Sequence, residues 1–116
     1  DVGCAVVPVH ARPVNLYGAG DVECCSFSGR IPGVVDRISS IFCEDRLPGL
    51  LTVEVPDELA IATTRKLMKL GFPVGPSSGL NYAAAVEVLK RKADPTAQVV
   101  TVFPDRMERY FTTELF

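Results

Sequence analysis

Three stretches of the chain are almost continuously apolar, which is typical of strands in a sheet that is buried on both faces. The first stretch runs from Gly3 to Val9, and the second runs from Leu50 to Val55. The third runs from Gln98 to Phe103. The stretch after the first strand, residues 9–21, contains proline and glycine, so we expect a surface connection there.

Helical periodicity occupies the stretches between these strands. A short helix is expected from Pro32 to about Ile41, because proline suits the first turn of a helix. A second helix is expected from Pro56 to about Leu70, where two acidic residues follow the proline and Gly71 can end the helix. A third is expected from Gly79 to Lys92, ended by an Asp-Pro pair. The expected apolar faces are Leu59, Thr63, Leu67 and Leu70 on the second helix, and Leu80, Ala84 and Val88 on the third.

Alternating strands and helices at this spacing predict an α/β fold. We expect a three-layer parallel sheet with flanking helices, connected by right-handed crossovers. A chain of 116 residues allows one small domain with a modest core. The chain begins without methionine and already inside a strand candidate. We therefore expect residues 1–116 to be a portion of a larger domain.

Composition and charge exclude several classes of function. The net charge is −2 with acidic and basic residues interspersed, so the sequence has no electrostatic footprint for nucleic acid. No apolar run reaches transmembrane length and the first residues lack a basic start, so we expect a soluble, cytoplasmic protein. His10 has no second histidine with which to share a metal, and we expect a loop or packing role for it. The cysteines fit no metal spacing and are expected to be reduced thiols, namely Cys4, Cys24, Cys25 and Cys43.

Candidate chemistry first arises at the turn Gly75-Pro76-Ser77-Ser78-Gly79. A turn of this kind at a helix start offers free backbone N–H groups and two hydroxyls, which could bind a polar or anionic group. The alternative is that Ser77 or Ser78 simply caps the helix, and the turn considered alone favours capping because serine is a preferred cap residue. An earlier segment, Gly18-Ala19-Gly20, lacks the third glycine of the dinucleotide-binding motif, so it is only a weak candidate for a phosphate-binding loop.

A second segment, Pro104-Asp105-Arg106-Met107-Glu108-Arg109-Tyr110, gives this turn its context. The two segments, in this order and at this separation, resemble the cysteine synthase and cystathionine β-synthase family. That family has a Gly-x-Ser-Ser-Gly helix start and an ending of the form Pro-Asp/Ser-x-x-Glu-Arg-Tyr. The resemblance covers nearly the whole chain and implies a partial fold-type II domain, similar to the tryptophan synthase β subunit, that depends on pyridoxal 5'-phosphate (PLP).

The resemblance also implies roles for individual residues. Ser77 matches the residue whose hydroxyl meets the pyridine nitrogen of PLP, while Ser78 and Gly75 belong to the same turn. Pro104 and Asp105 match positions whose backbone borders the cofactor ring. Arg109 and Tyr110 are expected to anchor the C-terminal tail. No catalytic residue is expected in this chain.

The sequence departs from the family at other positions. Cys25 and Phe27 stand where the family has glycines that let the backbone approach cofactor and substrate. The Schiff-base lysine and the phosphate-binding loop belong to earlier parts of the family's proteins, and the lysines of this chain have the spacing of solvent-facing helix residues.

We therefore expect the C-terminal portion of the large PLP-binding domain of a transferase or lyase that performs β-replacement or β-elimination on O-activated serine or cysteine. The chain alone should be inactive, and its binding of PLP alone is not expected. Its partners would be the remainder of the enzyme or a homodimer partner. The alternative is a non-catalytic interaction or regulatory protein that retained the fold.

Overall fold

The computed structural model describes residues 6–14 and 44–112. The elements in chain order are β1 (Val9–Pro13), a short 3-10 helix η2 (Glu44–Arg46) and β2 (Leu51–Val55), followed by α2 (Asp57–Lys69), α3 (Pro76–Lys92) and a 3-10 helix η3 (Met107–Tyr110). The helix expected at 32–41, the cysteines, and the positions Cys25 and Phe27 lie outside the described residues.

β1 and β2 form a parallel pair in which Val9 lies opposite Leu51 and Pro13 lies opposite Val55. The second strand was predicted from its apolar run and is confirmed. The first strand lies at Val9–Pro13 and residues 6–8 are not part of it, so the prediction of a strand that ends at Val9, with a connection after it, was wrong here. The rest of that prediction, at residues 3–5 and 15–21, lies outside the described residues. Ala11 faces the core, whereas Arg12 lies on the other face, 3.6 Å from Glu54. Pro13, which indicated a connection, is instead the last residue of this strand, and Arg12 belongs to its outer face.

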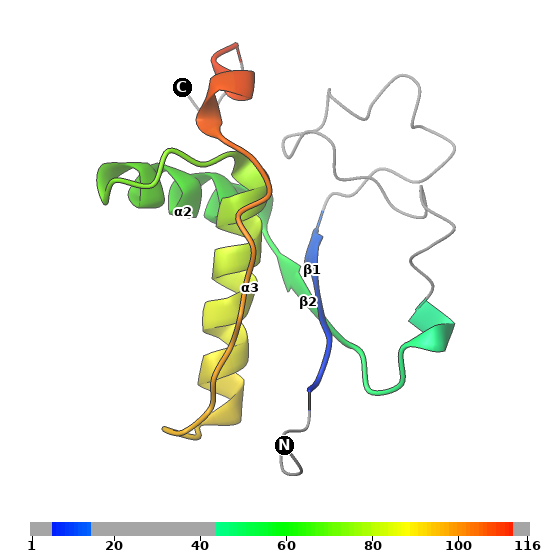
Figure 1. Ribbon diagram of the computed structural model, residues 1–116. Coiled ribbons are helices and arrows are strands. Elements are labelled where there is room, and N and C mark those ends of the chain that lie inside the picture. The colour runs from blue at the N-terminus through cyan, green and yellow to red at the C-terminus, as the bar shows by residue number, and fades with distance from the viewer. Residues whose placement is uncertain (1–5, 15–43, 113–116) are drawn as a thin grey trace.

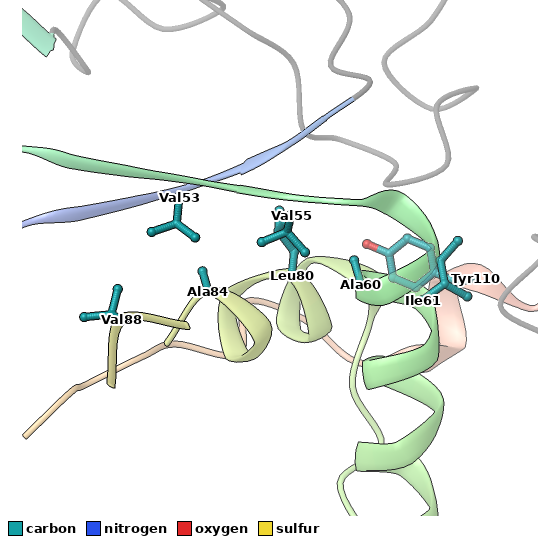
Figure 2. Packing of buried hydrophobic residues seen from close by; sticks show 8 residues of the cluster. All are labelled: Val53, Val55, Ala60, Ile61, Leu80, Ala84, Val88 and Tyr110. Carbon is teal, nitrogen blue, oxygen red and sulfur yellow. The ribbon is translucent and has the colours of Figure 1, made fainter. Parts of the chain in front are cut away.

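The two α-helices, α2 and α3, lie on the same side of this sheet (Figure 1). Val53 and Val55 of β2 point toward the face of α3 formed by Leu80, Ala84 and Val88 (Figure 2). These three residues of α3 are buried, as the sequence periodicity predicted. The parallel pair with helices packed on it agrees with the α/β fold expected from the sequence.

α2 follows β2 directly and ends as the sequence indicates. Asp57 and Glu58 occupy its first turn, where carboxylates oppose the positive end of the helix dipole. At its other end Gly71 has a φ of +100°, and the N–H of Phe72 donates to the carbonyl of Leu67 over 3.0 Å, which is a Schellman end.

The buried face of α2 differs from the face expected. Leu59 and Leu70 are 49% and 66% exposed, so the prediction that they share the apolar face was wrong. Leu67 is buried as predicted, but Ala60 and Thr64 are buried one position beyond the expected Leu59 and Thr63, because Gly79 of α3 sits directly against them. Only small side chains permit such a close approach of two helices. The buried set on α2 is Asp57, Ala60, Ile61, Thr64 and Leu67.

The segment from Gln98 to Phe103 runs back along α3 but is not a strand (Figure 1). Its Val99 packs against the core, and the side-chain amide of Asn81 donates to the carbonyl of Val102 over 3.0 Å. A strand requires a hydrogen-bonded neighbour, and no described strand pairs with this segment. The predicted third strand is therefore not formed in this structure.

Candidate functional site: the Gly75 turn and the 105–107 segment

The turn before α3 is held by a segment from the C-terminal part of the chain. The N–H of Gly75 donates to the carbonyl of Asp105 over 3.2 Å, and the N–H of Met107 donates to the carbonyl of Pro73 over 3.1 Å. Between these bonds, Val74 and Arg106 form an antiparallel bridge. The structure thus brings together the two segments that the sequence singled out as a pair.

α3 begins at Pro76, three residues before the expected start at Gly79. Gly75 is the N-cap residue, with extended backbone at φ −87° and ψ 175°, and no side chain caps the helix. The interpretation that Ser77 or Ser78 is a cap was therefore wrong, because both lie inside the first turn. The pre-set φ of Pro76 suits the first helical position and moves the boundary upstream.

The two serines differ in their surroundings. Ser77 is half-buried. Ser78 is fully buried, and its Oγ has no hydrogen-bond partner among the described residues. Pro76 has no N–H, and the N–H of Ser78 donates to the carbonyl of Gly75 over 3.0 Å. The start of α3 is still the positive end of the helix dipole, which favours an anion or an acceptor atom.

Asp105 and Tyr110 close the other side of the turn. The Tyr110 hydroxyl donates to Oδ2 of Asp105, and Arg109 lies 3.6 Å from the same carboxylate oxygen. Burial raises the pKa of the Tyr110 hydroxyl to about 12, and the hydrogen bond to Asp105 acts in the same direction. Tyr110 is therefore protonated, and able to donate, across the neutral range.

The remaining residues of this region are peripheral. Pro104 is exposed at the edge of the turn. Arg106 pairs with Glu108 over 3.0 Å on the surface, and this contact lowers the pKa of the Glu108 carboxyl. None of the chain's lysines lies at the turn: Lys66, Lys69, Lys90 and Lys92 are exposed near the C-terminal ends of α2 and α3.

A cavity of about 710 Å³ lies on the other side of α3. β1 and the residues before it line one wall, and the segment from Ala97 to Val102 lines another. β2 contributes only Leu51, so the cavity lies toward the β1 side of the sheet. Several valines around it are exposed, including Val6 at 84%, Val100 at 93% and Val102 at 65%. We call this region the β1 cavity.

Sequence reasoning found the serine turn and the Pro104-Asp105 segment, and it missed two features. The first is the link from Asp105 to Tyr110, which the sequence suggested only as an anchor of the tail. The second is the β1 cavity, for which the apolar residues of the third predicted strand were the available signal.

Within residues 6–14 and 44–112, no cluster of histidine, cysteine and carboxylate side chains could hold a metal ion. In the same residues no helix has the length and apolar character needed to cross a membrane.

The chain is similar in sequence to known enzymes. It is 37% identical over 117 residues to a probable cysteine synthase of Bacillus subtilis, an alignment that covers 100% of this chain and 35% of the relative. It is 38% identical over 119 residues to a cysteine synthase of Buchnera aphidicola, covering 99% of this chain and 36% of the relative. The chain thus spans about a third of the length of these relatives. No protein-family model matches it.

A solved structure is likewise similar to nearly all of this chain, and the chain again covers only part of it. The cystathionine β-synthase of Helicobacter pylori that depends on O-acetylserine has a TM-score of 0.71 and 28% identity, over 97% of this chain and 35% of that chain. The fold of the present chain is therefore that of one part of a larger enzyme.

Proposed function

Because this chain belongs to the cysteine synthase and cystathionine β-synthase family of fold-type II, PLP-dependent proteins, we propose that it is the C-terminal portion of the large PLP-binding domain of such an enzyme. The observation that carries this proposal is the pairing of the Gly75 turn with the 105–107 segment. These are the two segments that carry the family's motifs, and here they form one structural unit.

The residues of the turn fit one side of the cofactor. Ser77 offers a half-buried hydroxyl at the start of α3, where a ring nitrogen could accept or donate a hydrogen bond. The buried Ser78 Oγ adds a polar atom nearby. We propose that Ser77 and Ser78, together with Gly75 and the backbone of Pro104 and Asp105, form the ring-nitrogen side of the PLP site.

When bound, PLP supplies the electron sink that makes elimination and replacement at the β-carbon of an amino acid possible. Ser77 would tune this property, because a neutral hydroxyl does not force the ring nitrogen to stay protonated as an aspartate would. Such an environment suits β-replacement or β-elimination on O-activated serine or cysteine, which is the reaction class that we propose for the whole enzyme.

The chain alone should not perform this reaction. A Schiff base to PLP requires a lysine in the cleft, and every lysine of the chain is exposed near the end of a helix, away from the Gly75 turn. We propose that the lysine and the phosphate-binding loop come from the other part of the enzyme.

The β1 cavity supports a second part of the proposal, namely that the partner is the remainder of the enzyme. Parallel sheets are stable when their faces and edges are covered, and this cavity exposes β-branched side chains beside β1. A strand from the remainder of the enzyme or from a homodimer partner would cover them. The isolated chain should accordingly be marginally stable or self-associate.

A chimera tests the proposed function directly. The aligned segment of the Bacillus subtilis relative is replaced by this chain, and the purified product is examined for PLP absorbance and for cysteine formation from O-acetylserine and sulfide. We expect PLP to bind at one equivalent per chain. A chimera that folds, judged by a cooperative thermal transition, but binds no PLP would overturn the proposal.

The same chimera separates the enzyme from the non-catalytic alternative. Cys25→Gly combined with Phe27→Gly restores the glycines that the family has at these positions. Turnover by the unmodified chimera supports an enzyme. Bound PLP with turnover only after both substitutions would favour the regulatory alternative instead.

A further inference from the structure

The position of Ser77 depends on a chain of contacts that starts well after it in the sequence. Ser77 lies two residues beyond Gly75, and Gly75 is bonded through its N–H to the carbonyl of Asp105. The bridge between Val74 and Arg106 fixes the register of the two segments. Any movement of the 105–107 segment is therefore transmitted to the first turn of α3.

Tyr110 connects that segment to the hydrophobic core. Its side chain is 6% exposed and belongs to the same buried cluster as Ala60 and Ile61 of α2 (Figure 2). The ring is therefore fixed by packing, while the hydroxyl at its end donates to the Asp105 carboxylate. Through this hydrogen bond, Tyr110 links the Asp105 carboxylate to the core.

Gly75 is in direct contact with both members of this pair. A Cβ atom built on Gly75 would collide with Oδ1 of Asp105 and with the ring of Tyr110. The turn, the carboxylate and the tyrosine ring therefore lie against one another without intervening space. A shift of either side chain changes the contact surface of Gly75.

We propose that Tyr110 is a positioning residue that, by holding Asp105, sets the place of the Ser77 hydroxyl at the start of α3. This inference rests on the proposed function, because its consequence is the alignment of that hydroxyl with the PLP ring nitrogen. It assigns Tyr110 a role beyond anchoring the tail.

The Tyr110 hydroxyl is protonated at neutral pH, since the ordinary pKa of tyrosine, about 10, is already well above 7, and burial and Asp105 raise this pKa further, to about 12. The hydroxyl therefore remains a donor wherever the enzyme would work. Phenylalanine at this position would keep the packing against α2 and remove only the donor. The Asp105 carboxylate would then keep Arg109 as a partner but lose its connection to the core.

The test uses the full-length protein that contains this chain, purified with PLP. Tyr110→Phe should shift the absorption spectrum of the bound cofactor in the same direction as Ser77→Ala, and should weaken PLP binding roughly tenfold, the effect of about one lost hydrogen bond. Tyr82→Phe is the matched control, because it removes one hydroxyl from an exposed tyrosine of α3. The control spectrum should equal that of the wild type.

A double-mutant cycle gives a result that a merely structural role would not. If Tyr110 acts through Ser77, Tyr110→Phe should cause no further spectral change in a Ser77→Ala background. Additive shifts in the double variant would overturn the inference. Bound PLP with an unchanged spectrum in Tyr110→Phe would overturn it as well, while leaving the proposed function intact. A folded wild-type protein without PLP would overturn both.

Amide hydrogen exchange in the same proteins measures the link without using the cofactor. The N–H of Gly75 should exchange faster in Tyr110→Phe than in the wild type, because its acceptor segment is released. The amides of α3 beyond Leu80 should be unchanged. Equal exchange rates at Gly75 in the two proteins would contradict the positioning role.

Discussion

The two sides of α3 are packed very differently. On the side of α2, Gly79 touches the backbone of Ala60 and the side chain of Thr64, and Thr64 is fully buried. On the side of β1, a cavity of about 710 Å³ separates the sheet from the segment that contains Val100. One interface is complete within the described residues, whereas the other exposes the kind of side chains that usually lie inside a sheet.

This difference indicates which contacts the chain makes for itself and which it leaves to other polypeptide. At the α2–α3 crossing the Thr64 hydroxyl is satisfied internally: its Oγ1 donates to the carbonyl of Ala60 over 2.8 Å. The extended residues beside the β1 cavity have apolar side chains, and none of the strands in the described part of the chain pairs with them. The packed crossing carries the Gly75 turn, so the proposed PLP-binding side is built on the completed interface.

The largest effect on stability is expected from a substitution in the packed interface between α2 and α3. Gly79→Ala places a methyl group against Thr64 and the Ala60 carbonyl, so the helices must separate. We expect the free energy of unfolding to fall by about 3 kcal/mol or more, at the upper end of overpacking costs. Urea denaturation measures it. Lys90→Ala, on the exposed end of α3, should change stability by less than about 0.5 kcal/mol.

The next prediction concerns the exposed residues beside the β1 cavity. Val100→Lys should change the stability of the isolated chain by less than about 0.5 kcal/mol, because Val100 is 93% exposed. In the Bacillus subtilis chimera it should cost about 2 kcal/mol or more, because a charged side chain would become buried. Thermal denaturation of both forms decides this. Equal small effects in the two contexts would show that nothing covers the cavity.

Val99 provides the internal control for that comparison. It packs against the core within the described residues. Val99→Ala should therefore destabilise the isolated chain and the chimera by similar amounts, about 1 to 2 kcal/mol.

A smaller, stabilising effect is expected where α3 ends at the rim of the β1 cavity. Ala93 has a left-handed backbone with φ of +51°, which costs energy for a residue with a Cβ atom. Ala93→Gly should raise the free energy of unfolding by up to about 1 kcal/mol. A loss of stability in chemical denaturation would show that Ala93 makes contacts that outweigh its backbone strain.

The smallest effect is expected for Ser78→Ala on the packed side. The Ser78 hydroxyl is buried without a hydrogen-bond partner among the described residues, and it does not cap α3. Its removal loses no hydrogen bond, so stability should change by less than about 0.5 kcal/mol or increase slightly. A calorimetric loss above about 2 kcal/mol would show that the hydroxyl has a strong partner.

The sequence predicted elements whose signals are local. β2, α2 and α3 were found because an apolar run, acidic residues after Pro56 and the spacing of Leu80, Ala84 and Val88 are all read within a few residues. The end of α2 at Gly71 belongs to the same class. The Ser77 turn and the Pro104-Asp105 segment were found as motifs, and the structure brings them together, while their binding of PLP stays a prediction.

The errors arose where structure depends on distant contacts. β1 was misplaced because Pro13 considered alone indicates a connection, whereas in the structure it ends a strand whose Arg12 lies beside Glu54. The buried face of α2 was misassigned because the choice of small residues over Leu59 is made by Gly79 on another helix. The prediction of a third strand was wrong because a strand forms only where a second strand pairs with it, and the sequence of one segment does not show whether such a neighbour exists.

The antiparallel pairing of the Gly75 turn also has a consequence for the order in which the protein is made. During synthesis Gly75 leaves the ribosome well before Asp105 and Tyr110, so α3 can form against α2 while its first turn is still unsupported. The last contact to be established is then the one that fixes the turn. Translation would therefore deliver a folded helical pair first, and the N–H of Gly75 would gain its acceptor only when the later segment returns along α3.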